Sequence, residues 1–540
     1  MSIVFLLTAT LACSAPSKTP TQTLHVDGEM FSLDLDVVTP ASDTQLFQEI
    51  NELNLVVNQG SGESSSHMLS GRVSDGLADN NVLPALEDAR LTLIGGYDGQ
   101  TVFHGTSHPV TLTEGETQVS IFVARNDGPA NISPLRETRS LSPFIGTGDG
   151  RFYSFGGSTL GIQETESSTA ITRVDLSHPE DGLSPITLPA ALPSQPNGRG
   201  WLAQTANVIE GTSSLSGQIL IAGGAPTFPS NEGSVLGNVF PSTGAFRFDP
   251  VTEMIHEAGP MNHARVDHRS ATNHMGEVIV TGGFGVDGLP VGQIDVYSPE
   301  TDAWATRSQQ IQTGVVFHAM ARLADQGVLV CGGLTTATEN KYSDQCELVT
   351  HSHVIEAAHP MESALLFTDM VTLANGRVLR TGGLTPTDTA HTSFRPEAMA
   401  ATDRAAIYHG GQWHDVGSML NARAMHRSVL LPGGRVLIVG GVSGIDAGAA
   451  REGADNGLLY DHAKAIACAE IFDPETETFT ALESCGPLST NATLPERTLM
   501  PAIAVDATYG AMIAGGIGTD QGESVDGVVL FHPAYASSNQ

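Results

Sequence analysis

The sequence predicts an all-β protein, most of which repeats one structural unit. Three observations lead to this prediction. A short apolar strand that ends in a glycine pair recurs over most of the chain. A second strand and a tight turn follow most of these pairs. The 540 residues also include 59 glycines and 29 prolines without a collagen period, which is typical of proteins with many short strands and tight turns.

Residues 276–304 contain the unit in full. An apolar β-branched strand ends at Gly282-Gly283, a variable loop follows, and a second alternating strand ends at Tyr297. The turn that begins at Pro299 reverses the chain, and Trp304 opens a further strand. Proline sets a fixed φ at the start of such a turn. Each unit is therefore predicted to be a small antiparallel sheet.

The glycine pair occurs seven times, at intervals of 50 to 75 residues. The pairs are Gly156-Gly157, Gly223-Gly224, Gly282-Gly283, Gly332-Gly333, Gly382-Gly383, Gly440-Gly441 and Gly515-Gly516. With the linked turns and aromatic positions, residues 131–540 resemble the kelch-repeat β-propeller family. The resemblance implies a seven-bladed kelch-type β-propeller like the central domain of galactose oxidase, with six or eight blades as alternatives. The last unit lacks an outer strand, and residues 132–138 are predicted to supply it and close the ring.

Packing explains why such units must assemble. A four-stranded twisted sheet has two apolar faces and cannot bury both by itself. Stacking the sheets radially around an axis buries each face against a neighbour and leaves only short edges. The glycine pairs are predicted to allow a positive φ or a close backbone approach next to the axis.

Residues 24–130 lack the repeat and are predicted to form a separate domain. Apolar and polar residues alternate in segments that begin at Phe31, Leu53, Arg90 and Gln118. Short strands with turns between them predict a small β-sandwich of immunoglobulin-like type. Its expected role is that of a spacer between a membrane and the larger domain.

The first 13 residues resemble a bacterial lipoprotein signal peptide. A largely apolar run from Ile3 to Ala12 is too short to span a bilayer and leads to Cys13, which would be lipidated and become the N-terminal residue. Residues 14–23, rich in Ser, Thr and Pro, are predicted to be a flexible tether. The resemblance implies an exported lipoprotein anchored in the outer membrane and facing the periplasm or the surface. Ordinary cleavage and secretion is the alternative.

The four other cysteines are predicted to form two disulfides. Cys331 and Cys346 flank the loop after a glycine pair, and Cys468 and Cys485 flank a hairpin turn almost symmetrically. Two antiparallel strands in that register bring the Cβ atoms close enough for a bond. An even number of cysteines in an exported protein favours such pairing. Small buried thiols are the alternative.

The chain is strongly acidic, with a formal net charge of −34. Such a surface repels phosphate backbones, so nucleic acid is not expected as a partner. The charge is expected to serve solubility, with capture of calcium or other cations in Asp-rich loops as the alternative. We expect the protein to be a monomer.

One ring of residues is predicted at a mouth of the propeller channel. His268, His318, Thr368 and His426 each lie fourteen positions before the first glycine of their pair. Counting back in the other units, with a five-residue insertion allowed in the second, gives Ser142, Gln204 and Pro501. These residues open the innermost strands, which all run the same way along the axis. Equivalent positions should therefore meet at one end of the channel.

Arginines accompany two of these histidines, Arg265 and Arg269 beside His268, and Arg423 and Arg427 beside His426. A channel mouth with His and Arg could hold a carboxylate, a sulfated sugar or a metal ion. The alternative is that the Arg-x-x-His pair is a kelch fingerprint whose side chains satisfy loop carbonyls between blades.

No catalytic motif accompanies the repeat. The chain lacks a Gly-x-Ser-x-Gly elbow, a His-Glu-x-x-His pair, a phosphate loop and a sialidase Asp box. We therefore expect a non-catalytic binding or scaffold module for a protein or glycan at the cell surface, without a cofactor. Residues 384–402 and 444–464 are the expected contact loops. The alternative is a copper-radical oxidase-like or other carbohydrate-active enzyme that uses the channel mouth.

Overall fold

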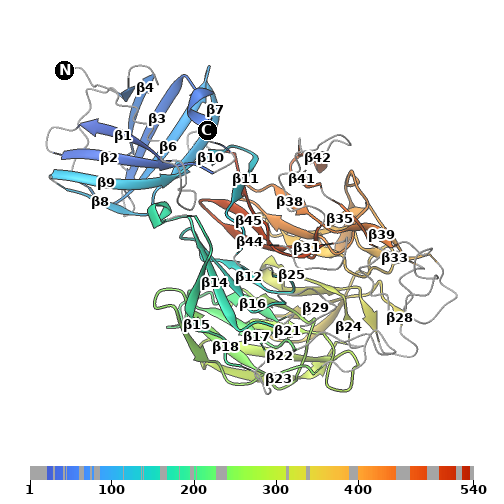
Figure 1. Ribbon diagram of the computed structural model, residues 1–540. Helices are drawn as coiled ribbons and strands as arrows, with labels where there is room; N and C mark the ends of the chain where they lie inside the picture. The colour runs from blue at the N-terminus through green and yellow to red at the C-terminus, as the bar shows by residue number, and fades with distance from the viewer. Residues whose placement is uncertain are drawn as a thin grey trace.

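The structure is a computed structural model of the chain (Figure 1). It describes residues 21–27, 31–40, 43, 45–59, 66–72, 76–77, 86–113, 115–135, 137, 139–158, 167–181, 183–194, 200–201, 204–226, 240–311, 315–335, 341–387, 399–445, 463–466, 468–482, 498–518 and 526–534. Apart from strands, these residues contain three short 3-10 helices, η1 (Leu46–Gln48), η2 (Pro179–Asp181) and η3 (Ala324–Gln326). No helix among them is long and apolar enough to cross a bilayer.

The N-terminal domain is a sandwich of two sheets. The smaller sheet has the order β1 (Thr21–Asp27), β2 (Phe31–Val38) and β9 (Gly115–Phe122), with β2 and β9 parallel. The larger sheet has the order β10 (Ala124–Arg125), β7 (Gln100–Thr106), β6 (Leu86–Tyr97), β3 (Glu52–Gln59), β4 (Ser66–Arg72) and β5 (Gly76–Leu77), and β8 (Val110–Leu112) pairs with β6. Strand β1 begins at Thr21, so the predicted tether of residues 14–23 runs three residues too far.

The alternating pattern of the sequence places one face of each sheet in a shared core. Leu33, Leu35 and Val37 of β2 are fully buried against Leu55 of β3 and Leu93 of β6. Because side chains alternate between the two faces of a strand, every second residue meets the opposite sheet. The predicted β-sandwich is confirmed.

The rest of the chain contains eight four-stranded antiparallel sheets within the described residues, and seven of them form the propeller. From the inner to the outer strand, they are β12 (Phe144–Gly146), β13 (Arg151–Phe155), β14 (Ala170–Asp175) and β15 (Ile186–Ala191); β16 (Thr205–Val208), β17 (Ile219–Ala222), β18 (Ala245–Asp249) and β19 (Met254–Glu257); β20 (Arg269–Thr272), β21 (Val278–Thr281), β22 (Gln293–Ser298) and β23 (Ala303–Gln310); β25 (Ala319–Leu323), β26 (Gly327–Cys331), β29 (Cys346–Thr350) and β30 (Ile355–Ala358); β31 (Asp369–Thr372), β32 (Val378–Thr381), β35 (Ala405–His409) and β36 (Gln412–Asp415); β37 (Arg427–Leu430), β38 (Val436–Val439), β41 (Glu470–Asp473) and β42 (Thr478–Ala481); and β44 (Ala502–Asp506), β45 (Gly510–Ala514), β47 (Val528–His532) and β11 (Gly128–Ile132).

These sheets stand around a common axis. The innermost strands contact one another in the order β12, β16, β20, β25, β31, β37 and β44, and β44 contacts β12 again. An apolar cluster fills each space between neighbouring sheets, such as that of Ile279 and Val296 with Val328 and Val349. Each sheet thus buries both faces, as the radial arrangement requires. The structure confirms the predicted all-β propeller that follows a β-sandwich.

One strand from the start of the propeller closes the ring. Strand β11 pairs antiparallel with β47, so the last sheet takes its outer strand from residues that precede the first sheet. The closing strand was predicted at residues 132–138, and it lies at Gly128–Ile132 instead. The expected domain boundary at residue 130 falls inside this strand.

The glycine pairs lie where the second strand of each sheet ends beside the axis, and all fourteen glycines have positive φ. At Gly282, an added Cβ would lie 2.4 Å from His318 Cε1, and at Gly283 it would lie 2.7 Å from the carbonyl oxygen of Val266. Both the backbone conformation and the lack of space therefore require glycine.

The two domains share a buried interface next to the closing strand (Figure 1). Phe122 and Ala124 of the sandwich belong to the same apolar cluster as Phe144, Tyr509 and Leu530 of the propeller. The Tyr509 hydroxyl donates to the carbonyl oxygen of Thr106 at 2.9 Å. These contacts join the sandwich to the first and last sheets of the propeller.

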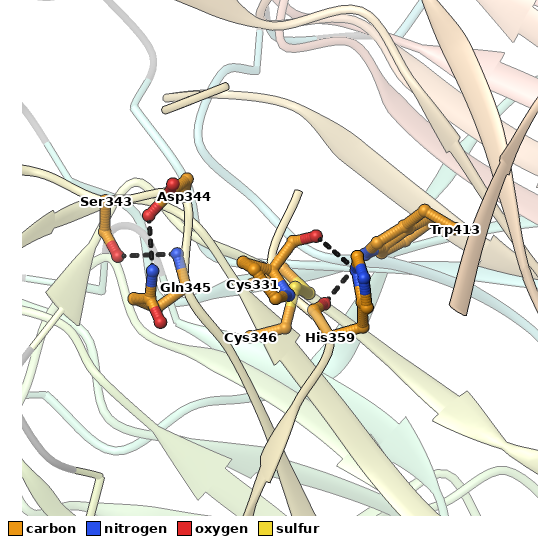
Figure 2. The surroundings of a disulfide bond; sticks show 8 residues. Cys331, Ser343, Asp344, Gln345, Cys346, His359 and Trp413 are labelled. Atoms are coloured by element: carbon orange, nitrogen blue, oxygen red, sulfur yellow. Dashed lines mark hydrogen bonds between the residues drawn. A yellow bond between two sulfur atoms is a disulfide. The ribbon is translucent and has the colours of Figure 1, made fainter. Parts of the chain in front are cut away.

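The structure contains one of the two predicted disulfides within its described residues. Cys331 and Cys346 are directly opposite each other on β26 and β29 and are bonded (Figure 2). Cys468 is a free thiol, and Cys485 lies outside the described residues. The hairpin pairs Phe472 with Phe479 and Glu470 with Ala481. The second predicted pair lies partly outside the described residues and stays a prediction.

Candidate functional site

The predicted ring of histidines lies between the sheets and not at an open mouth. His268, His318 and His426 are at most 1% exposed. Their Nε2 atoms lie 3.0, 3.0 and 2.9 Å from the hydroxyl oxygens of Thr205, Thr281 and Thr381, each on the preceding sheet. Each imidazole also covers the first glycine of that sheet's pair, where a Cβ would collide with its Cε1.

Burial keeps these imidazoles neutral. It lowers the pKa of His268 and His426 well below the usual value, and it lowers the pKa of His318 to about 3. The charges of nearby arginines act in the same direction. Neutral rings held on threonine hydroxyls fit a structural role between blades.

Two of the four predicted arginines are structural as well. Arg265 and Arg423 are fully buried, and each donates to the carbonyl oxygen of the first glycine of its own sheet, Gly282 or Gly440, at 2.9 Å. Arg265 is paired with Asp295 at 2.9 Å, and Arg423 is paired with Glu470 at 2.6 Å. These arginines hold loop carbonyls within the blades, which is the alternative that the sequence left open.

An apolar layer covers the end of the channel beyond the histidines. It is made by the residues just before the ring positions and just after the glycine pairs, and it includes Leu141, Phe284, Phe317, Leu334, Phe367, Leu384, Met425, Val442, Met500 and Ile517. Backbone hydrogen bonds connect cover residues of neighbouring sheets. Phe367 N donates to Phe317 O at 2.9 Å, and Met425 N donates to Phe367 O at 3.2 Å. The predicted open mouth is therefore replaced by a hydrophobic cover.

Small ribbons extend this cover. They consist of β24 (Val315–Val316), β27 (Leu334–Thr335) and β28 (Lys341–Tyr342), of β33 (Leu384–Pro386), β34 (Met399–Ala401), β39 (Val442–Ile445) and β40 (Ala463–Ala465), and of β43 (Thr498–Leu499) and β46 (Ile517–Gly518). The described ends of the two expected contact loops meet here, because Ala400 pairs with Gly444. Most of residues 446–462 and 388–398 lie outside the described residues.

Beneath the cover, the channel contains a cavity of about 340 Å³ lined by all seven innermost strands or the residues next to them. Arg269 and Arg427 line it, together with Asp267 and Asp369. Gln204 also borders the cavity and donates from Nε2 to the carbonyl oxygen of Phe155 at 2.7 Å. The structure thus brings four of the eight predicted ligand-binding residues to the lining of this cavity, namely Gln204, His268, Arg269 and Arg427.

The charged groups of the cavity are not paired with one another. Among the described residues, neither Arg269 nor Arg427 has a hydrogen bond or an ion pair, and the carboxylate of Asp267 has none either. Asp369 accepts backbone N–H hydrogen bonds from Ser428, at 2.6 Å, and from Met370. Arg265 and Arg423, by contrast, are buried in ion pairs.

The enclosure changes the protonation equilibria of this group. Burial raises the pKa of the Asp267 and Asp369 carboxyls, and the nearby charges of Arg269 and Arg427 only partly oppose it. Burial also lowers the pKa of Arg427, and the charge of Arg269 adds to this effect. Asp267, Asp369 and Arg427 thus lack full compensation for their lost hydration.

The two aspartates escaped the sequence analysis, although a signal was present. At the position just before the ring, the other units carry Leu141, Phe317, Phe367, Met425 and Met500, and Asp267 is the charged exception among the described residues. At the position just after the ring, Asp369 is equivalent to Arg269 and Arg427. Comparing the units position by position would have grouped them.

The described residues do not fit the copper site that the family resemblance implies. Such a site needs imidazole nitrogens that converge on one point. Here, His268, His318 and His426 hold their Nε2 atoms in three different spaces between sheets. Within the described residues, no three His, Cys, Asp or Glu side chains are grouped closely enough to hold a metal ion.

No protein-family profile matches the chain, and no curated protein matches it in sequence. Solved structures do match. The structure of YjhT is 15% identical, with a TM-score of 0.45 over 65% of this chain and 99% of that one. A fungal alcohol oxidase of the AA5 family, in complex with copper, is 14% identical, with a TM-score of 0.49 over 75% of this chain and 76% of that one. These similarities concern the fold and not the function.

Proposed function

We propose that this chain is an exported binding protein whose propeller holds a small polar ligand in its central channel. The observation that carries the proposal is the channel cavity, in which Arg269 and Arg427 line the wall without a partner among the described residues. An arginine that is removed from bulk water without a carboxylate loses hydration free energy. A ligand with an oxyanion would restore it through charge-assisted hydrogen bonds.

Export is supported by the disulfide between Cys331 and Cys346, which is typical of oxidising compartments. The lipid anchor at Cys13, the outer-membrane location and a protein or glycan partner at the loops remain part of the proposal, and Cys13 lies outside the described residues. Replacement of Cys13 by Ser should move the protein from the membrane fraction to the soluble fraction. Unchanged fractionation of this variant would contradict the anchor.

A thermal-shift screen of the full chain tests the binding function. The panel contains small carboxylates, sulfates, amino acids and neutral saccharides, and a compound that enters the cavity should raise the Tm in proportion to its occupancy. The shift should disappear in the double variant Arg269→Gln/Arg427→Gln. It should persist in Arg322→Gln, which removes an arginine of β25 whose ion pair with Glu210 is outside the cavity. The absence of any shift across the panel, or a shift that survives in the double variant, would contradict the proposal.

A further inference from the structure

We propose that the channel cavity selects a zwitterionic small molecule with a hydrocarbon body, whose oxyanion lies on Arg269 and Arg427 and whose ammonium lies on Asp267 and Asp369. This inference rests on the proposed function and names the chemical class of the ligand. It follows from where the charges lie around the axis, from their lack of partners, and from the apolar character of the opposite wall.

Three of the four charges lie at one level of the channel. Arg269, Asp369 and Arg427 are each the first residue of an innermost strand, in β20, β31 and β37. Strand β25 lies between β20 and β31 and carries the small Ala319 at this position. The charges of both signs are thus placed on one side of the channel, where Met320 of β25 also lines the cavity.

The absence of internal pairing points to a ligand. Arg427 and Asp369 lie on neighbouring strands, yet no ion pair joins them within the described residues. Separated charges in an enclosed site keep a large desolvation cost, which a direct ion pair would reduce. The unpaired arrangement is expected where a ligand completes it.

Charges of both signs select against ligands of one sign. A dianion would bring negative charge to the two carboxylates, and a dication would bring positive charge to the two guanidinium groups. Like charges repel each other more strongly in a medium of low dielectric than in water. A molecule with one oxyanion and one ammonium satisfies both pairs.

The other half of the channel is largely apolar. At the level of the charges, β44 begins with Ala502, and Pro143 directly precedes β12. Phe144 and Ile503 continue this wall. A hydrocarbon chain can pack here, and the Oε1 atom of Gln204, which is buried and has no partner among the described residues, offers one more acceptor for an ammonium.

Titration calorimetry on the full chain can test the inference with three probes of equal length. The probes are 5-aminopentanoate, glutarate and 1,5-diaminopentane, which differ in the charges of their ends. We expect 5-aminopentanoate to bind about tenfold more tightly than either of the others, a difference of about 1.4 kcal/mol. No variant is needed for this comparison, so a failure to fold cannot affect it.

Charge variants then test the assignment of each end. The Asp267→Asn/Asp369→Asn variant should bind glutarate more tightly than 5-aminopentanoate, and Arg269→Gln/Arg427→Gln should prefer 1,5-diaminopentane. Arg322→Gln should keep the wild-type order. Glutarate or the diamine binding the wild-type protein as tightly as the zwitterion would overturn the inference and leave the proposed function standing. If none of the three binds, the inference is wrong. The proposed function falls with it only if the thermal-shift panel is also negative.

Discussion

At the scale of single residues, adjacent positions in the sequence serve different purposes. His268 and His426 join neighbouring sheets through threonine hydroxyls, while Arg269 and Arg427, one residue later, line the cavity. Successive residues of a strand point to opposite sides, so a one-residue step turns a packing group into a ligand-facing group. The histidines therefore belong to the stability of the propeller, and the arginines beside them belong to its proposed binding function.

Replacing His318 by Ala should destabilise the propeller. The change leaves a cavity above Gly282 and removes the partner of the Thr281 hydroxyl. We expect the free energy of unfolding to fall by about 2–4 kcal/mol, measured by denaturant titration. His409, which is exposed at the end of β35, offers a control whose change to Ala should have an effect of less than about 0.5 kcal/mol. Equal effects of the two substitutions would contradict the structural role.

Replacing Asp267 by Asn should stabilise the free protein. The carboxylate has no hydrogen bond among the described residues, and burial raises its pKa. A raised folded-state pKa means that ionisation costs stability, and this cost appears as the pH rises above the ordinary carboxyl pKa of about 3.9. Asn also tolerates a positive φ such as that of Asp267, which is 55°. At pH 7, we expect a gain of about 1 kcal/mol, which should vanish near pH 3.5; a loss at pH 7 would contradict the assignment.

At the scale of strands and turns, the repeat could be predicted because it depends on local patterns. Glycine pairs, alternating strands and Asp-Pro turns are all visible in the sequence. The limits appeared where register decides, since the closing strand lies at Gly128–Ile132 and not at residues 132–138. A shift of a few residues changes no local pattern, so the sequence alone could not detect it.

The contents of the cavity were only partly predictable for a different reason. Arg269 and Arg427 stood out because they flank histidines, whereas Asp267 and Asp369 lie in different units that are 102 residues apart in the sequence. Their approach depends on the closure of the ring, which is a long-range property. The apolar cover over the predicted histidine mouth could not be foreseen for the same reason, because it forms only when residues from several sheets meet.

The cross-strand disulfide should stabilise the fourth sheet. Cys331 and Cys346 are 15 residues apart and belong to an apolar cluster with Met361 and Tyr408. In Figure 2, His359 and Trp413 lie beside them, and Trp413 Nε1 donates to the carbonyl oxygen of His359 at 3.2 Å. For a loop of this length, we expect Cys331→Ala/Cys346→Ala to lower the free energy of unfolding by about 3 kcal/mol. Cys468→Ala is the matched control, and an equal loss there would contradict the prediction.

At the scale of the whole molecule, two stacked histidine pairs cross the interface between the sandwich and the propeller. His104 stacks on His532 with ring centroids 4.0 Å apart, and His108 stacks on His178 at 4.8 Å. His104 and His532 are buried, whereas His178 is partly exposed beside Asp175. Charged groups near Tyr509 at this interface include Arg90, Asp149, Asp175 and Asp506, and Asp127 forms an ion pair with Arg435.

Acid should loosen this interface. Burial and the neighbouring His104 lower the pKa of His532 to about 3, and burial also lowers the pKa of His104. Both rings regain an ordinary pKa of about 6.5 when exposed, so the interface keeps its full stability above that pH. The interface then loses about 1.4 kcal/mol per pH unit through His532 as the pH falls towards the folded-state pKa of that ring, and the lowered pKa of His104 acts in the same direction. Amide exchange of β7 and β47 should therefore accelerate between pH 7 and pH 4.5 at matched intrinsic rates. The variant His532→Phe keeps a flat ring but takes up no proton, and an unchanged acid response in it would rule out this mechanism.

The central claim is that the closed channel of the propeller is a binding site for a zwitterion. Its most direct test is a crystal structure of the protein soaked with 5-aminopentanoate. We predict electron density in the cavity, with the carboxylate within hydrogen-bond distance of Arg269 or Arg427 and the ammonium within that distance of Asp267 or Asp369. Density for the ligand elsewhere on the molecule, or a bound ligand whose ends are reversed, would contradict this account.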